Sequence, residues 1–160
     1  MYINREIDHI LLDWKNADRH KPLILRGVRQ CGKTSAVRNL SQQFADYIEL
    51  NLEKEPDIGK IFEGELNINR IINRLELHFS KRIGSDTLLF IDEIQECPRA
   101  ITALRYFYED KPELHVIAAG SLLEFVLDGQ KKDKPVDFPV GRVRSIFMYP
   151  FSFTEFLHGT

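Results

Sequence analysis

Apolar and polar residues alternate along the chain in blocks that have the period of a strand or of a helix. Strand-length apolar runs or alternating stretches occur at 22–27, 47–54, 87–93 and 114–121. Helices are predicted between them, at 33–44, 66–83 and 98–112. Strands that alternate with helices indicate right-handed crossovers. We therefore expect an α/β fold with a mainly parallel, five-stranded sheet and helices on both faces.

The two ends of the pattern add further elements. A leading helix is predicted from Asn4, the expected cap, with one apolar face made of Ile7, Ile10, Leu11 and Trp14. After the fourth strand come a short helix at 122–127 and a polar stretch at 128–137, which has too little apolar surface to order itself. A fifth strand is predicted at 142–151.

The last residues contain the start of another helix. Ser152 and Glu155 have the spacing of a capping box, in which each residue bonds the backbone of the other. Few residues follow to build the helix that this box would open. We therefore expect residues 1–160 to be one domain and the N-terminal part of a longer protein.

Composition narrows the class of protein. Apolar residues make up 43% of the chain, and 22 Lys and Arg against 24 Asp and Glu give a net charge of -2. This balance is ordinary for a globular domain and favours neither a nucleic-acid nor a membrane partner. The N-terminus lacks the apolar core of a signal peptide, and no apolar run approaches a membrane span. We expect a cytoplasmic protein with Cys31 and Cys97 as reduced thiols and no zinc site.

The sequence GVRQCGKT at 27–34 lies between a predicted strand and a predicted helix. In such a loop consecutive backbone N–H groups converge on one point, and the helix adds the positive end of its dipole. Lys33 would bridge the outer phosphates of a nucleotide, and the Thr34 hydroxyl would bind Mg²⁺. We expect the nucleotide to contact Gly27, Val28, Arg29, Gln30, Cys31, Gly32, Lys33, Thr34 and Ser35, with the backbone rather than the thiol of Cys31 facing the phosphates.

Two acidic residues end the predicted strand at 87–93. Open α/β sheets bind ligands at the carboxyl ends of their strands, so these residues should lie beside the loop. Asp92 is placed to hold Mg²⁺ through water. Glu93 is placed to accept a proton from the water that attacks the γ-phosphate. Lys33 and Glu93 are thus the first catalytic candidates.

Other polar residues allow two interpretations each. Ser121, at the end of the fourth strand, would orient water or sense the terminal phosphate, or it belongs to an ordinary turn. Arg29 would touch phosphate or form a surface ion pair, and Gln95 stays undecided. Arg142 precedes the fifth strand and should lie far from its own nucleotide; it is either an arginine finger for a neighbouring subunit of a homo-oligomer or an exposed arginine.

Four stretches stand in the order found in a known family: LILRGVRQCGKTSAV, LLFIDEIQECP, VIAAGSLLEF and VGRVRSIFMYPFSFTEFL. Together they resemble the AAA-superfamily ATP-binding domain of a widespread prokaryotic family of predicted ATPases. The resemblance implies a P-loop NTPase three-layer sandwich and ATP rather than GTP. It also implies a Walker A motif at Gly27–Thr34, a Walker B motif at Asp92–Glu93, a sensor-like Ser121, and a position for Arg142 where AAA proteins carry finger residues.

Members of that family usually continue into a C-terminal domain with suspected DNA-binding and nuclease-like character, so the resemblance implies DNA contact only through such a domain. Mg-ATP binding with hydrolysis to ADP and phosphate is the main functional hypothesis. A nucleotide-dependent switch with little turnover is the alternative. A small-molecule P-loop kinase, with 131–144 as a basic lid, is disfavoured because Glu93 suits water activation. The guanine-reading N-K-x-D sequence of GTPases is absent.

Overall fold

The computed structural model describes residues 2–121, 137–152 and 155. Its centre is a sheet of five strands in the order β2-β3-β4-β1-β5, in which every neighbouring pair is parallel. This confirms the predicted α/β class and parallel sheet. The strands are β1 (Leu23–Arg26), β2 (Asp46–Asn51), β3 (Thr87–Asp92), β4 (His115–Gly120) and β5 (Arg144–Phe147).

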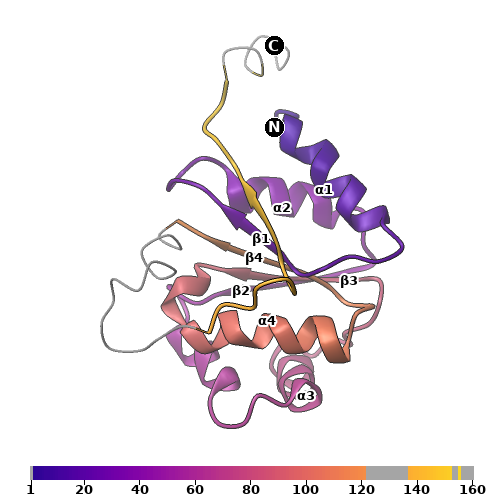
Figure 1. Ribbon diagram of the computed structural model, residues 1–160, viewed down its shortest axis with the longest axis vertical. Coiled ribbons are helices and arrows are strands. Elements are labelled where there is room, and N and C mark those ends of the chain that lie inside the picture. Colours follow the sequence, from indigo (N-terminus) through magenta and orange to yellow (C-terminus); the bar gives the residue numbers. More distant parts are fainter. Residues whose placement is uncertain (1, 122–136, 153–154, 156–160) are drawn as a thin grey trace.

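Helices cover the two faces of this sheet (Figure 1). On one face lie α1 (Glu6–Asn16) and α2 (Lys33–Ser41), and on the other lie α3 (Ile68–Phe79) and α4 (Pro98–Asp110). The result is the three-layer sandwich that the sequence predicted. All strands run the same way, so their carboxyl ends meet at one edge of the sheet.

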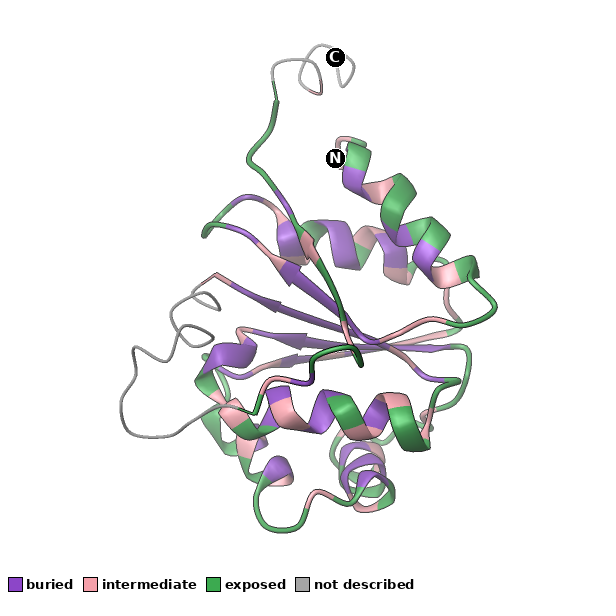
Figure 2. Ribbon diagram, in the orientation of Figure 1, coloured by how far each residue is buried: buried purple, intermediate pink, exposed green. Residues whose placement is uncertain are grey.

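Alternate residues of a strand point to opposite layers, and this builds two apolar cores. Figure 2 shows buried residues on the central strands and on the helices of both layers. Leu23 and Leu25 of β1 pack with α1 and α2, whereas Ile24 between them packs with α3 and α4. All six residues of β3 are buried, because this strand has a neighbour on each side and helices on both faces. A continuous apolar run such as 87–91 is typical of such a strand.

The start of α1 differs from the prediction. Arg5, not Asn4, is the N-cap, and its backbone N–H donates to Asp8 Oδ2 at 2.7 Å. The Asp8 carboxylate thus supplies the reciprocal half of a capping box, and the Asp8 N–H donates to the Arg5 carbonyl oxygen at 3.0 Å, so the Asn4 side chain is not needed. Ile10 is 37% exposed and does not belong to the core, because the buried stripe is narrower than predicted and contains only Ile7, Leu11 and Trp14.

Other boundaries also move. Strand β2 ends at Asn51, and Pro56–Phe62 forms a 3₁₀ helix (η1) that buries Ile58 and Phe62 and that the pattern did not predict. Helix α3 ends at Phe79 because Ser80 adopts a left-handed conformation, with φ of 52°. Helix α2 ends three residues before its predicted limit, and β5 covers less than half of 142–151.

The predictions at 122–127 and over most of 128–137 lie outside the described residues. Of the predicted final helix the structure describes Ser152 and Glu155, which form both bonds of the capping box: Ser152 N–H to Glu155 Oε2 at 2.9 Å and Glu155 N–H to Ser152 Oγ at 3.1 Å. Cys31 and Cys97 are free thiols. Among the helices that the structure describes, none has the length and apolar character needed to cross a membrane.

Candidate functional site

The loop between β1 and α2 has the backbone of an anion cradle. Gly27, Gln30 and Gly32 have φ angles of 148°, 62° and 95°, and α2 starts directly after the last of them. A Cβ atom on Gly27 would lie 2.3 Å from the carbonyl oxygen of Met148, so no side chain fits there. The loop therefore needs glycine both for its turn and for its contact with the segment that follows β5.

Lys33 extends into this loop from the first turn of α2. The residue is 6% exposed, and its ammonium donates to the carbonyl oxygens of Gly27 and Val28, both at 2.8 Å. The charge is thus held inside the curve of the loop. Cys31 is buried against the apolar core between the sheet and α2, and its Sγ lies 3.9 Å from Lys33 Nζ.

Asp92 ends β3 beside this loop. Thr34 Oγ1 donates to Asp92 Oδ2 at 3.0 Å, and the Asn51 amide reaches the same oxygen at 3.4 Å from the neighbouring strand. Burial raises the pKa of Asp92 above its usual value, the nearby charge of Glu93 adds to this rise, and the Thr34 hydrogen bond opposes it. A cation beside Asp92 would remove the cost of keeping this carboxylate ionised.

The hydroxyl of Thr34 and the carboxylate of Asp92 are hard oxygen ligands, which suit Mg²⁺. In the described part of the chain, no group of three or more His, Cys, Asp or Glu side chains could hold a metal by itself. A magnesium ion at Thr34 and Asp92 would therefore take its remaining ligands from phosphate and water. This is the usual pattern where Mg²⁺ is bound with a nucleotide.

Glu93 follows with an uncommon backbone conformation. Its φ is 51°, in the left-handed region, and Gln95 Nε2 donates to Glu93 Oε2 at 2.6 Å. Gln95 is 3% exposed, and its Oε1 has no partner among the described residues. The backbone turn and the buried amide together fix the direction of the Glu93 carboxylate.

These groups line one pocket of about 380 Å³. The pocket brings together the loop and the acidic pair, which are about 60 residues apart in the sequence. Its volume is at the lower end of the range of ligand sites, as expected for a site that holds phosphates. The lining residues are Arg29, Gln30, Gly32, Lys33, Thr34, Ser35, Glu53, Asp92 and Glu93.

The remaining candidates lie elsewhere. Arg29 is at the rim and forms an exposed ion pair with Glu53 at 3.0 Å. Ser121 follows β4 at the same sheet edge, outside the pocket lining, and its Oγ is buried with no partner among the described residues. Arg142 precedes β5, whose Arg144 pairs with the first residue of β1, so Arg142 lies toward the opposite edge. There its Nε is 3.2 Å from a Glu109 carboxylate oxygen.

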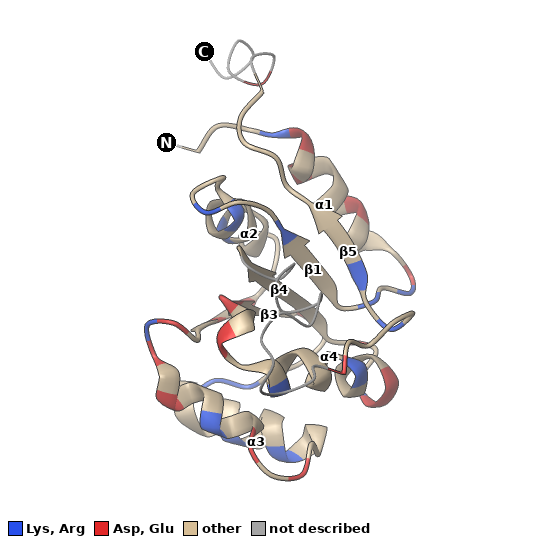
Figure 3. Ribbon diagram, turned by 60° about the vertical axis from the view of Figure 1, so that its left-hand side comes forward, with Lys and Arg blue, Asp and Glu red and all other residues tan. Residues whose placement is uncertain are grey.

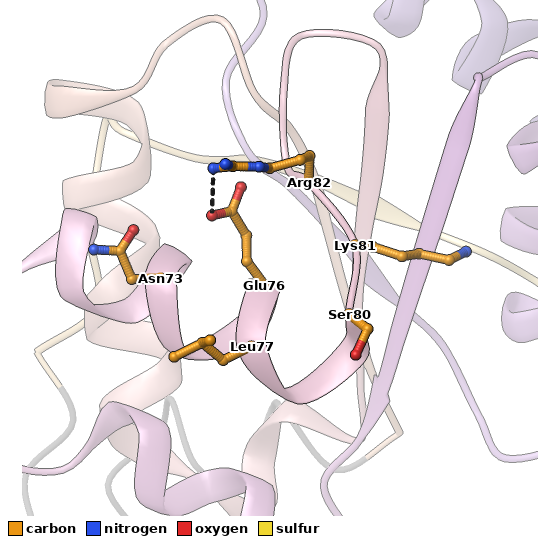
Figure 4. Close-up of a pocket in the computed structure, with 6 residues that line it drawn as sticks. All are labelled: Asn73, Glu76, Leu77, Ser80, Lys81 and Arg82. Carbon is orange, nitrogen blue, oxygen red and sulfur yellow. Dashed lines mark ion pairs between the residues drawn. The ribbon is translucent and has the colours of Figure 1, made fainter.

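A second pocket, of about 470 Å³, lies at the end of α3 (Figure 4). Its charged groups are already engaged: Arg82 pairs with Glu76 at 3.6 Å, and Glu76 also accepts the Ile83 N–H at 2.9 Å. The pocket lies where the chain returns to start β3, which is the amino edge of the sheet. It has neither a glycine loop nor a helix start.

Sequence reasoning missed one residue that touches the loop. Arg5 is 6% exposed, and its Nη1 donates to the carbonyl oxygen of Cys31 at 2.6 Å. A single arginine before an amphipathic helix is typical of a surface residue, and its partners lie 26 to 150 residues away. No signal in the sequence joined them.

Comparison with known proteins agrees with this geometry. The family model described as AAA domain matches residues 19–157. No curated protein matched significantly. The Walker-type ATPase PABY2304 of Pyrococcus abyssi is a similar solved structure, with a TM-score of 0.61 and 18% identity over 96% of this chain. Caenorhabditis elegans PCH-2 follows with a TM-score of 0.49 and 19% identity over 89%.

This chain spans 55% of the Pyrococcus protein and 41% of the nematode protein. At such low identity the likeness concerns the fold, which is shared with a Walker-type ATPase. The family match is broader evidence because it takes in the loop, the acidic pair and the strand β5. Together with the geometry of the glycine loop it supports an ATP-binding P-loop function, and the chain belongs to the AAA domain family.

Proposed function

We propose that this domain binds Mg-ATP and hydrolyses it to ADP and phosphate. The observation that carries the proposal is the single pocket in which the glycine loop and Lys33 meet Asp92 and Glu93, with Thr34 bonded to Asp92 at 3.0 Å. A phosphate cradle and a carboxylate suited to activating water are the two parts that hydrolysis requires.

Binding is assigned to the loop. The N–H groups at the start of α2 and the Lys33 ammonium would contact the β- and γ-phosphates. Thr34 and Asp92 would hold Mg²⁺, which supplies positive charge that stabilises the transition state. Of the nine loop residues predicted to contact the nucleotide, six line the pocket. Cys31 and Val28 would act through the backbone only.

Glu93 is assigned the role of general base. In the proposed step, a water oxygen attacks the γ-phosphorus while one water proton passes to the Glu93 carboxylate. The bond between the γ-phosphorus and the bridging oxygen breaks, and the electron pair leaves with ADP. Gln95 would keep the carboxylate turned to this water, and Ser121 would sense the terminal phosphate from the end of β4.

A nucleotide-dependent switch with little turnover is the second candidate. It is favoured by the position of Arg142, which lies toward the opposite edge of the sheet and pairs there with Glu109, away from the pocket of its own chain. Rapid hydrolysis would then need Arg142 from another copy, in a homo-oligomer. A DNA contact is not part of the proposal, because acidic and basic segments are interspersed over the described elements (Figure 3). The cytoplasmic location stays a prediction.

Phosphate release with Mg-ATP tests the proposal. The Glu93→Gln variant should lose about 10²–10⁴-fold in turnover and keep its affinity for ADP, because it lacks only the base. The matched control is Glu96→Gln, which changes an exposed carboxylate outside the pocket. Equal turnover in wild type and Glu93→Gln would contradict the assigned role. ATP binding without phosphate release in the wild type would support the switch instead.

A further inference from the structure

Arg5 lies directly before α1 and is 6% exposed, and it is the one buried arginine among the residues that the structure describes. Burying a guanidinium is costly unless its donors are satisfied. Its Nη1 donates to Cys31 O at 2.6 Å and its Nη2 donates to Tyr149 O at 2.9 Å. Arg5 therefore joins the start of the chain to the phosphate loop and to the segment after β5.

Glu155 completes this arrangement. Its carboxylate lies 3.3 and 3.4 Å from two guanidinium nitrogens of Arg5 and accepts the backbone N–H of Glu6 at 3.2 Å. The ring of Phe151 lies 4.1 Å from the guanidinium carbon. The Ser152 N–H and Arg5 stabilise the ionised form and lower the pKa of Glu155 to about 2. Glu155 is thus charged at neutral pH and opposite a fixed cation.

The contact with Cys31 has a geometric consequence for the loop. A trans peptide unit points its C=O and its N–H in opposite directions. Because the Cys31 carbonyl oxygen points toward Arg5, the Gly32 N–H in the same peptide unit points away from Arg5. Gly32 lines the pocket, and a Cβ atom on it would lie 3.3 Å from Arg5 Nη1. Arg5 thus acts on the direction of a phosphate-facing donor.

We propose that Arg5 is a positioning residue for phosphate binding and that Glu155 holds Arg5 in place. Arg5, Tyr149 and Glu155 are here called the clasp. In this account the affinity of the loop for nucleotide depends on the segment after β5 being docked, although no clasp residue touches the nucleotide. The inference rests on the proposed nucleotide binding and adds a connection between the pocket and a segment more than 100 residues away.

Calorimetric titration with Mg-ADP tests the clasp in Arg5→Lys and Glu155→Gln. Lysine keeps the charge of Arg5 but cannot bond Cys31, Tyr149 and Glu155 together. We expect about tenfold weaker binding for Arg5→Lys and about three- to tenfold weaker binding for Glu155→Gln. The matched control is Arg38→Gln, which removes a two-bond pair with Glu49 at 2.8 and 2.9 Å on the surface of α2 and β2. Its affinity should stay within about twofold of wild type.

Glu155→Gln also separates positioning from simple electrostatics. Removing a negative charge near the loop would strengthen anion binding if charge alone mattered, whereas loss of positioning weakens it. Amide exchange provides a second readout: the 27–34 segment should exchange faster in both clasp variants while β3 keeps its protection. A purely structural ion pair would lower stability without this local change.

The outcomes are distinct. Weaker Mg-ADP binding with faster exchange in the loop supports the clasp. If both variants bind Mg-ADP as tightly as wild type, or if Glu155→Gln binds it more tightly, the clasp proposal is wrong. The proposed function is then unaffected. Failure of the wild-type protein to bind Mg-ADP overturns the proposed function, and the clasp with it.

Discussion

At the carboxyl ends of the strands, buried charged groups surround a pocket of about 380 Å³, whereas the amino ends border a larger pocket of about 670 Å³ between α1, α4 and β4. The smaller pocket contains Lys33 and Asp92, each at most 6% exposed. The larger one contains His20 and His115, whose rings stack with centroids 3.9 Å apart. Volume alone would not select the nucleotide pocket, because another pocket of about 890 Å³, beside η1 and the start of α4, is larger than both.

The amino end uses its polar groups to join elements. The ring nitrogens of His115 each lie 3.1 Å from a carbonyl oxygen, one of Ser85 and one of Lys15, and Trp14 packs edge-on against the ring. These contacts connect β4 to α1 and to the turn before β3. The side chain has no free direction in which to meet a ligand.

The carboxyl end combines strained backbone with the buried charged side chains of Lys33 and Asp92. Gln30 and Glu93 have left-handed φ angles, and both line the pocket. The third non-glycine residue with a left-handed φ in the described part of the chain is Ser80, an ordinary helix end on the other edge. Strain that the fold maintains next to buried charge is a better sign of function than pocket volume.

Replacing one glycine at each end should give the largest contrast. Gly27→Ala places a Cβ 2.3 Å from Met148 O, so we expect a loss of about 2–4 kcal/mol in unfolding free energy together with loss of nucleotide binding. Gly84→Ala meets nothing within 4 Å and should change stability by less than about 1 kcal/mol. Urea unfolding measures both. Equal effects at the two sites would contradict the close contact of the loop.

Asp92→Asn should separate the stability of the free protein from its affinity for Mg-ATP. The pKa of Asp92 is raised by burial, so ionised Asp92 lowers stability as pH rises from about 3.8 through its folded pKa. The variant should therefore unfold at the same or a higher temperature than wild type at pH 7. Its affinity for Mg-ATP should fall about 10- to 100-fold. A variant with lower thermal stability and unchanged affinity would contradict the metal role.

The smallest effect is expected at the amino end. Burial and the neighbouring His20 lower the pKa of His115 below 6.5, so the unfolded chain takes up protons first on acidification. Wild type should lose stability as pH falls from about 6.5 toward the folded pKa, and His115→Gln should lose less. The difference should stay below about 1 kcal/mol, because His115 is only partly buried. Thermal unfolding between pH 7 and pH 5 measures it, and Mg-ADP affinity should not change.

Much of this contrast could be predicted from the sequence, because its signals are local. The glycine spacing at 27–34 and the acids after an apolar run each occupy fewer than ten residues. Each strand or helix of the alternating pattern spans fewer than twenty residues. They gave the parallel sheet and the two motifs at its carboxyl edge. The 3₁₀ helix at Pro56–Phe62 was missed because only two of its residues, Ile58 and Phe62, are buried.

The rest depends on contacts between distant segments. Arg5 was missed because its burial results from Cys31, Tyr149 and Glu155, which no periodicity connects. Asn4 was wrongly chosen as the cap because the decisive acceptor is the side chain of Asp8, inside the helix. The direction of Glu93 likewise depends on a left-handed backbone, which residues other than glycine rarely adopt and which the sequence therefore does not predict.

Calorimetric titration of Mg-ATP into wild type, Lys33→Ala and Lys15→Ala tests the central claim most directly. Lys15 is the matched lysine of the amino end, with its ammonium 4.8 Å from the ring centroid of Phe44. The account predicts that wild type and Lys15→Ala bind alike and that Lys33→Ala binds about 100-fold more weakly, since it loses charge-assisted bonds to phosphate. Equal binding by Lys33→Ala and wild type would contradict the assignment of the loop as the nucleotide site.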